Sequence, residues 1–179
     1  MQYMTDADLN AMAKFIKTMD GQAAEAAPEK LATPGPRSSA APAADEAGKA
    51  TATMLKSAAP DMPLGARVYL DNCAACHFTS GKGSPEIFPE LQGNPMVLGK
   101  DASPLLSVIL KGTSSTMTER RPMNLVMQGY ADRLTDNEVA ALATFLRKGW
   151  GNQASDVSES LVSKVRRHVQ ADAAPQRSL

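Results

Sequence analysis

The chain has 179 residues, with 19 basic and 19 acidic side chains, two cysteines and two histidines. The balanced charge and the lack of a basic run interleaved with aromatic residues argue against a partner nucleic acid. No apolar stretch approaches the roughly 20 residues that span a bilayer. The opening residues, MQYMTDADLN, are acidic where a secretory signal would be basic. The length fits a small domain with attached segments.

The first predicted element is an amphipathic helix over residues 5–17, TDADLNAMAKFIK, and a near copy, TDNEVAALATFLR, stands at residues 135–147. Each copy begins with a threonine followed three residues later by an acid, the pattern of a capping box. Each continues with apolar residues at helical spacing. Any two amphipathic helices can look alike. We favour the alternative that residues 1–20 are the terminal helix of a preceding, truncated copy of the later domain, which makes the chain a C-terminal piece of a longer protein.

Residues 21–60 are dominated by Ala, Pro, Ser, Thr and charged side chains and contain no aromatic residue. Such a segment buries too little apolar surface to offset the entropy lost on ordering. We therefore expect a disordered, Ala/Pro-rich linker here. Roughly ninety residues, 61–150, remain for a packed domain, and residues 151–179 form a C-terminal tail.

Both cysteines lie in the pentapeptide CAACH, residues 73–77. It has four candidate uses: a disulfide, a redox dithiol, part of a zinc site, or covalent attachment of a haem. A disulfide leaves His77 without a role, and a zinc site needs about four ligands, whereas the other histidine, His168, lies far away in the tail. The dithiol of thioredoxin-like proteins follows a strand, and no strand is predicted here. The pattern is typical of c-type haem attachment, in which the thiols of Cys73 and Cys76 bind the two vinyl groups and the imidazole faces the iron.

The segments around CAACH are predicted to be mostly helical. CAACH ends a helix over residues 66–77, and it is followed by a loop FPELQGNP at 88–95, a helix-like run at 101–112 and a helix at 135–148. We expect the helices of 66–77 and 135–148 to cross. The residues expected at their closest contact are Gly65, Tyr69, Leu142 and Phe145.

This order of motifs resembles the class I cytochrome c family, whose fold is all-α. Pro89 and Leu91 stand where that family has a Pro-x-Leu loop. The resemblance implies that the Pro89 carbonyl accepts the Nδ1 hydrogen of the ligand His77, which fixes the tautomer of the imidazole. It also implies that Leu91 packs on the haem face. An ordinary turn is the alternative role for Pro89.

The second iron ligand is expected from a methionine after residue 95. The segment MQGYADRLTD at 127–136 resembles the family's Met–Pro–x–Phe loop, with Gln128 in place of Pro and Tyr130 in place of Phe. The resemblance implies that Met127 is the axial ligand opposite His77. Plain core packing is the alternative for this side chain. The other methionines that were candidates are Met96, Met117 and, as the main alternative, Met123.

A closer resemblance covers most of the chain outside the linker. QYMTDADL and the run FLRKGWGNQASDVSESLV, which contains Trp150, Gly151 and Asn152, resemble the triple-haem cytochrome c subunit of membrane-bound bacterial dehydrogenases. These oxidise alcohols, gluconate, fructose or sorbitol with PQQ or flavin on a separate large subunit. In that family, residues 61–150 correspond to the third haem domain.

The resemblance implies an electron-transfer subunit rather than the enzyme itself. It would carry one covalent haem c with His and Met ligands, and would pass electrons from the large dehydrogenase subunit toward membrane ubiquinone in a respiratory chain. Its expected place is the periplasmic side of the bacterial inner membrane. The rival interpretations are a haem enzyme or sensor whose methionine dissociates, and a CxxC motif that holds no haem.

The tail carries a further predicted helix at residues 154–170, with Ser155 as a candidate cap. Its apolar stripe recurs every four residues at Val157, Leu161, Val165 and Val169. We interpret it as a docking helix. The stripe packs back onto the haem domain, contacts the dehydrogenase subunit or the lipid headgroups, or stays disordered. Basic residues near the helix end favour an anionic surface, such as the membrane surface, and they are Lys164, Arg166, Arg167 and His168.

Overall fold

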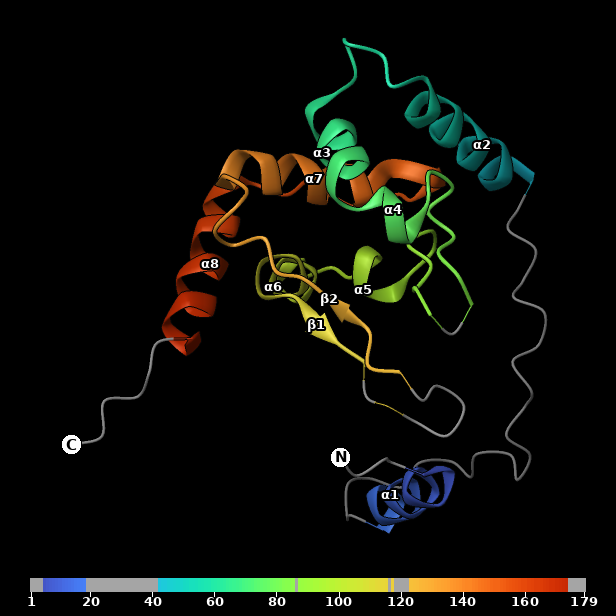
Figure 1. Cartoon of the computed structure of the whole chain (residues 1–179), viewed down its shortest axis with the longest axis vertical. Helices are drawn as coiled ribbons and strands as arrows, with labels where there is room; N and C mark the ends of the chain where they lie inside the picture. Colours follow the sequence, from blue (N-terminus) through green and yellow to red (C-terminus); the bar gives the residue numbers. More distant parts are fainter. Residues whose placement is uncertain (1–4, 19–41, 86, 116, 118–122, 174–179) are drawn as a thin grey trace. The chain divides into compact units, whose positions relative to one another are not determined.

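The computed structural model describes residues 5–18, 42–85, 87–115, 117 and 123–173 (Figure 1). The chain divides into two compact units. One comprises Met1–Ser39 with Ser114–Leu125, and the other comprises Ala40–Thr113 with Val126–Leu179. The described residues are mostly helical, with one small sheet, so the predicted all-α class is confirmed.

The first unit contains helix α1 (Asp6–Thr18). Its N-terminus is capped as predicted, because the Asp8 amide donates to the Thr5 hydroxyl over 3.1 Å and the Thr5 amide donates to the Asp8 carboxylate over 2.8 Å. The apolar side chains along this helix are exposed. α1 is therefore a locally well-specified helix whose apolar stripe is not buried.

The core of the second unit is the crossing of α3 (Leu64–Asn72) and α7 (Asp136–Lys148), seen in Figure 1. A Cβ atom on Gly65 would lie 2.1 Å from the carbonyl oxygen of Ala141, so only glycine permits this approach. The rings of Tyr69 and Phe145 lie 5.5 Å apart. The predicted crossing is confirmed, with Gly65, Tyr69 and Phe145 at the contact, and Leu142 is buried in α7.

The predicted helix of residues 66–77 is not continuous. α3 stops at Asn72, and a short α4 (Ala74–His77) follows after Cys73, which has φ −121° and ψ −32°. The amides of Cys76 and His77 both donate to the Cys73 carbonyl, over 3.2 and 3.0 Å. This shared acceptor tightens the turn and starts a new helical segment at the first cysteine.

Five further elements follow in the chain. They are α5 (Pro95–Leu98), α6 (Ser103–Lys111), β1 (Thr113–Ser114), β2 (Val126–Met127) and the 3-10 helix η1 (Gly149–Gly151). The two strands pair in one sheet. α7 begins with the predicted capping box between Thr135 and Glu138. Within the described residues, no helix combines the length and hydropathy that a bilayer span requires.

Helix α2 (Pro42–Ser57) corrects the predicted disordered linker of residues 21–60. Leu55 is fully buried, and α2 packs on η1. Alanine-rich sequence has high helix propensity, and Leu55 and Met54 add α2 to the apolar core. Residues 21–41 of the predicted linker lie outside the described residues. The compact unit is therefore larger than the predicted domain at 61–150.

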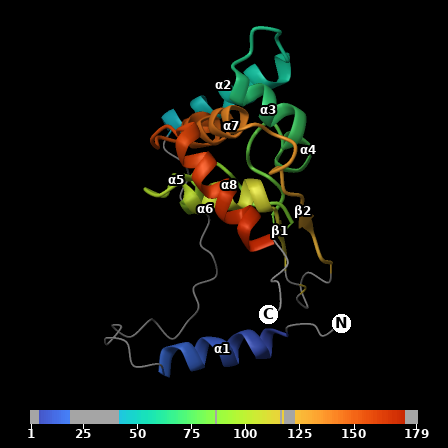
Figure 2. The ribbon, with the colours of Figure 1, turned by 90° about the vertical axis from the view of Figure 1, so that its left-hand side faces the viewer.

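A helix lies in the tail as predicted, but α8 (Glu159–Ala173) starts and ends later than the expected residues 154–170. It packs on α6 and α7 (Figure 2), and the stripe is buried, with Val157, Val165 and Val169 at most 9% exposed. The helix begins after Ser158, whose hydroxyl accepts the Leu161 amide over 3.3 Å, and not at Ser155. The stripe thus docks on the chain's own domain and is not free for lipid or for another subunit.

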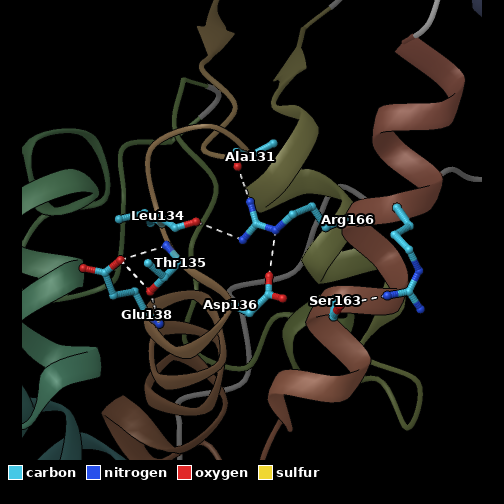
Figure 3. Close-up of polar contacts among 8 residues, drawn as sticks. Ala131, Leu134, Thr135, Asp136, Glu138, Ser163 and Arg166 are labelled. Atoms are coloured by element: carbon cyan, nitrogen blue, oxygen red, sulfur yellow. Dashed lines mark hydrogen bonds and ion pairs between the residues drawn. The ribbon is translucent and has the colours of Figure 1, made fainter.

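One of the basic side chains predicted for an anionic surface also serves inside the fold. Figure 3 shows Arg166 reaching from α8 to the start of α7. Its guanidinium pairs with Asp136 over 2.7 Å and donates to the carbonyls of Leu134, over 2.9 Å, and of Ala131. Arg166 therefore fixes α8 to the segment that leads into α7.

Candidate functional site

The CAACH segment presents its two thiols on one tight turn. Cys73 is half-buried, Cys76 is exposed, and both are free thiols. Burial raises the pKa of the Cys73 thiol to about 12, and the neighbouring Cys76 adds to the shift. A redox dithiol needs a thiol whose pKa is lowered, so the first cysteine is unsuited to that alternative.

His77 ends α4 with its ring held in one orientation. The side chain is 9% exposed, and its Nδ1 lies 3.0 Å from the carbonyl oxygen of Pro89. A carbonyl only accepts hydrogen bonds, so Nδ1 carries the proton and Nε2 keeps its lone pair. Burial lowers the pKa of His77, and the Pro89 contact only partly opposes this. The neutral imidazole, which is the form that binds metals, is favoured.

The loop that carries Pro89 folds back on the CAACH turn. The Leu91 amide donates to the Gly81 carbonyl over 2.7 Å, and the Gly83 amide donates to the His77 carbonyl over 3.2 Å. A Cβ on Gly83 would lie 2.7 Å from the Pro89 oxygen, so glycine is needed for this approach. Pro89 itself is exposed, and Leu91 is 9% exposed. The hydrogen bond implied by the resemblance is present, and the alternative of an unconnected turn is not needed.

The Trp150–Asn152 turn fastens the CAACH segment to the Pro89 loop. Trp150 is fully buried and donates from its indole nitrogen to the Thr79 carbonyl over 2.9 Å. The Asn152 side chain accepts the Gly93 amide over 2.8 Å and donates to the Leu91 carbonyl over 3.1 Å. The resemblance singled out this turn, and the structure shows what it holds.

The sequence interpretation missed the part that α2 plays at this turn. The hydroxyl of Thr51 accepts the Trp150 amide over 3.0 Å. Gln92 adds a second bond from the Pro89 loop to the Trp150 carbonyl, over 2.8 Å. The spacing of Thr51 and Leu55 by four residues was a local signal of this helix face, and the Ala/Pro-rich composition outweighed it.

Arg147 is a second residue that the sequence interpretation missed. It is 1% exposed, and its guanidinium donates to the carbonyls of Val97, Gly99 and Ser155 over 2.7 to 2.9 Å. It also donates to the Ser155 hydroxyl over 3.1 Å. A buried charge is costly unless its hydrogen-bonding capacity is used. Arg147 therefore holds α5 and the residues after η1 against α7.

The candidate methionines lie in different settings. Met127 belongs to β2 and is partly exposed, Met117 is also partly exposed, Met123 is 61% exposed and Met96 in α5 is 47% exposed. A Cβ on Gly112, at the end of α6, would lie 2.4 Å from the Met127 oxygen, so β2 runs in backbone contact with this glycine. The assignment of an iron ligand among these sulfurs stays a prediction.

The residues around CAACH fit a c-type haem. Two thiols on one turn and an imidazole with a free Nε2 are the donor set that the cofactor requires. Among the described residues from 78 to 98, four large apolar side chains are more than a third exposed. They are Phe78, Ile87, Met96 and Leu98. Among the residues that the structure describes, no group of three or more Cys, His, Asp and Glu side chains could hold a metal ion.

Comparison with known proteins agrees with this geometry. The model of the cytochrome c family matches residues 63–150. The alcohol dehydrogenase (quinone) cytochrome c subunit of Gluconobacter oxydans (strain 621H) is 36% identical over 166 residues, which are 92% of this chain and 31% of that protein. The gluconate 2-dehydrogenase cytochrome c subunit of Pantoea cypripedii is 30% identical over 155 residues, 86% of this chain and 31% of that protein.

The fructose dehydrogenase cytochrome subunit of Gluconobacter japonicus is 28% identical over 171 residues, 93% of this chain and 34% of that protein. The chain thus spans about a third of the length of these relatives. The CAACH turn, the His77–Pro89 bond and the family match converge on one conclusion. Residues 63–150 are a cytochrome c domain, and the chain is homologous to the cytochrome c subunits of alcohol, gluconate and fructose dehydrogenases.

Proposed function

We propose that this chain transfers electrons through one covalently bound haem c. Cys73 and Cys76 would hold the haem by thioether bonds, and His77 and Met127 would be the axial ligands. Bound haem c supplies an iron that alternates between ferric and ferrous states, one electron at a time.

The observation that carries the proposal is the contact between His77 Nδ1 and the Pro89 carbonyl, 3.0 Å apart. It fixes the tautomer and directs Nε2 away from the Pro89 loop. A second-shell acceptor of this kind raises the basicity of a ligating histidine. Burial of His77 excludes water from the ring and keeps the imidazole neutral, as a metal ligand must be.

The choice of electron transfer over catalysis rests on the second ligand. If His77 and a methionine both bound the iron, side chains of the chain itself would hold the haem iron from both sides. Such ligation raises the reduction potential and leaves no position for a small substrate. A dissociable methionine would instead give the haem enzyme or sensor.

The proposed partners follow from the names of the relatives. The relatives named above are cytochrome subunits of dehydrogenases, and three of those found are by name cytochrome c subunits of alcohol dehydrogenase (quinone). We therefore place this chain between a large dehydrogenase subunit with PQQ or flavin and membrane ubiquinone, on the periplasmic side of the inner membrane. Contact with an anionic membrane surface would use the exposed Lys164, Arg167 and His168 on α8.

The first test is haem attachment in the full chain matured with a cytochrome c assembly system. Denaturing mass spectrometry should show the added mass of one haem, and a reduced-minus-oxidised spectrum should show the c-type bands. The double variant Cys73→Ala, Cys76→Ala should lose the covalent haem. An unmodified parental chain after such maturation contradicts the proposal.

The second test separates electron transfer from sensing. The reduced holoprotein should be reoxidised by a water-soluble ubiquinone analogue in stopped-flow measurements and should not bind carbon monoxide at the iron. Rapid carbon monoxide binding by the parental protein would favour the sensor. Protease protection in spheroplasts and salt-dependent flotation with anionic vesicles test the location and the membrane contact.

A further inference from the structure

Tyr130 connects the methionine loop to the haem-attachment helix. Its side chain is 4% exposed, and its hydroxyl donates to the carbonyl of Asn72 over 2.7 Å. Asn72 is the last residue of α3 and immediately precedes Cys73. The hydrogen bond thus links Tyr130, three positions after Met127, to the residue just before the attachment turn.

The acceptor is available because α3 breaks at Cys73. The final carbonyls of a helix lack partners within it. In a continuous helix the Cys76 amide would donate to Asn72, but here it donates to the Cys73 carbonyl over 3.2 Å. The Tyr130 hydroxyl donates to the Asn72 carbonyl, which this break leaves without the amide of Cys76 as a partner.

Gln128 extends the connection. Its side-chain nitrogen donates to the Tyr130 hydroxyl over 3.1 Å, and a tyrosine hydroxyl can donate and accept at once. These two residues stand where the family's loop has Pro and Phe. A proline restrains the backbone by fixing φ, whereas Gln128 has no such restraint. The two replacements instead restrain the loop together, through side-chain hydrogen bonds that Pro and Phe cannot form.

The backbone on the other side of Tyr130 is also anchored. The amides of Tyr130 and Ala131 donate to the carbonyls of Ile109 and Leu110 over 3.0 and 3.1 Å. A Cβ on Gly129 would lie 2.5 Å from the Leu110 oxygen. The segment after Met127 is therefore fixed to the end of α6, and the Tyr130 hydroxyl is its link to α3.

We propose that Tyr130 and Gln128 position Met127 as the axial ligand, by tethering its loop to the Asn72 carbonyl beside Cys73. The inference rests on the proposed role of Met127. Both are positioning residues. Loss of the tether releases the loop from α3 but not from α6, so the methionine sulfur competes less well with an external ligand for the iron.

The test is imidazole titration of the oxidised full-length holoprotein, followed by the loss of the weak long-wavelength absorption of the sulfur–iron bond. Tyr130→Phe removes only the hydroxyl and should lower the apparent Kd for imidazole about two- to tenfold, the range that one net hydrogen bond corresponds to. Tyr69→Phe is the matched control, since Tyr69 is fully buried and its hydroxyl donates to Phe78 over 2.6 Å on the histidine side. It should leave the imidazole Kd within twofold.

Gln128→Leu provides a second measurement, because this side chain is exposed and its loss does not threaten folding. It should shift the Kd in the same direction by a smaller factor, and should add nothing to Tyr130→Phe. An unchanged Kd in both variants overturns the tether. Met127→Ala separates the two hypotheses: loss of the sulfur–iron band with an unchanged Tyr130→Phe overturns the tether alone, whereas a band that survives Met127→Ala overturns the ligand assignment and the tether with it.

Discussion

Helices α1 and α7 share a sequence pattern, but only α7 has its apolar face buried. The two copies are offset by 130 residues, and in both a threonine and an acid three residues later cap the helix. Met12 is 52% exposed in α1, whereas its counterpart Leu142 is 1% exposed in α7. Ile16 and Leu146 differ in the same way, at 62% and 5%.

The difference shows that helix formation and helix burial are encoded separately. The cap and the helical spacing are local, so they act wherever the segment stands. Burial needs a partner surface of matching shape. For α7 that surface is α3, where the missing side chain of Gly65 admits the backbone at Ala141.

The largest expected effect comes from cutting equivalent side chains in the two helices. Leu142→Ala should destabilise the protein by about 2 to 5 kcal/mol, because it leaves a cavity in a fully packed site. Met12→Ala should change the free energy of unfolding by less than about 0.5 kcal/mol. Urea denaturation of the full holoprotein, followed by circular dichroism, measures both. Equal losses would show that the α1 stripe is buried in solution.

A second substitution tests the surface of α3 on which α7 packs. Gly65→Ala places a methyl group against the α7 backbone and should cost about 1 to 3 kcal/mol through overpacking. Gly48→Ala in α2 is the matched control, because a Cβ there would meet only the Gln92 side chain, at 3.5 Å. It should stabilise by about 0.4 to 1 kcal/mol. A neutral Gly65→Ala would mean that α3 and α7 can move apart without loss.

Removing the two helix caps should have different effects on global stability. Thr135→Ala should cost about 1 kcal/mol of global stability, because α7 belongs to the cooperative core. Thr5→Ala should leave the unfolding midpoint unchanged and lower only the helix content of α1. Chemical denaturation gives the first value, and amide hydrogen exchange over residues 6–18 gives the second. A lowered unfolding midpoint in Thr5→Ala would show that α1 unfolds together with the core.

The smallest expected effect is a pH dependence. Hydrogen bonds from Thr135 lower the pKa of Glu138 below its ordinary value of 4.5, and bonds from Thr5 lower the pKa of Asp8 below 3.8. A lowered folded-state pKa adds stability above the unfolded pKa, and this is lost as the pH falls through the folded value.

Acidification should therefore lower global stability through the α7 cap. At the α1 cap it should lower only the local helix content. Glu138→Gln should reduce the slope of the urea midpoint against pH in the acidic range, whereas Asp8→Asn should not. If Glu138→Gln and the parental protein show the same slope of urea midpoint against pH, the α7 cap does not cause the pH dependence.

Much of the site was predictable because it is written in short motifs. The capping residues, the CAACH turn and the glycine at the helix crossing each act through neighbours in sequence or through one crossing contact. The family resemblance added the Pro89 carbonyl for His77, and the structure has that hydrogen bond. The break at Cys73 was not predicted, because helical spacing continues across it.

Tertiary structure alone decided how the flanking segments are used. The Thr51 hydroxyl meets an amide 99 residues away, and the Arg147 guanidinium meets carbonyls about 50 residues away. The stripe of α8 is buried against α6 and α7, although the sequence alone also allowed contact with lipid or with another subunit. An amphipathic pattern states which face of a helix is apolar. What buries that face depends on contacts between residues far apart in the chain, and no local pattern contains them.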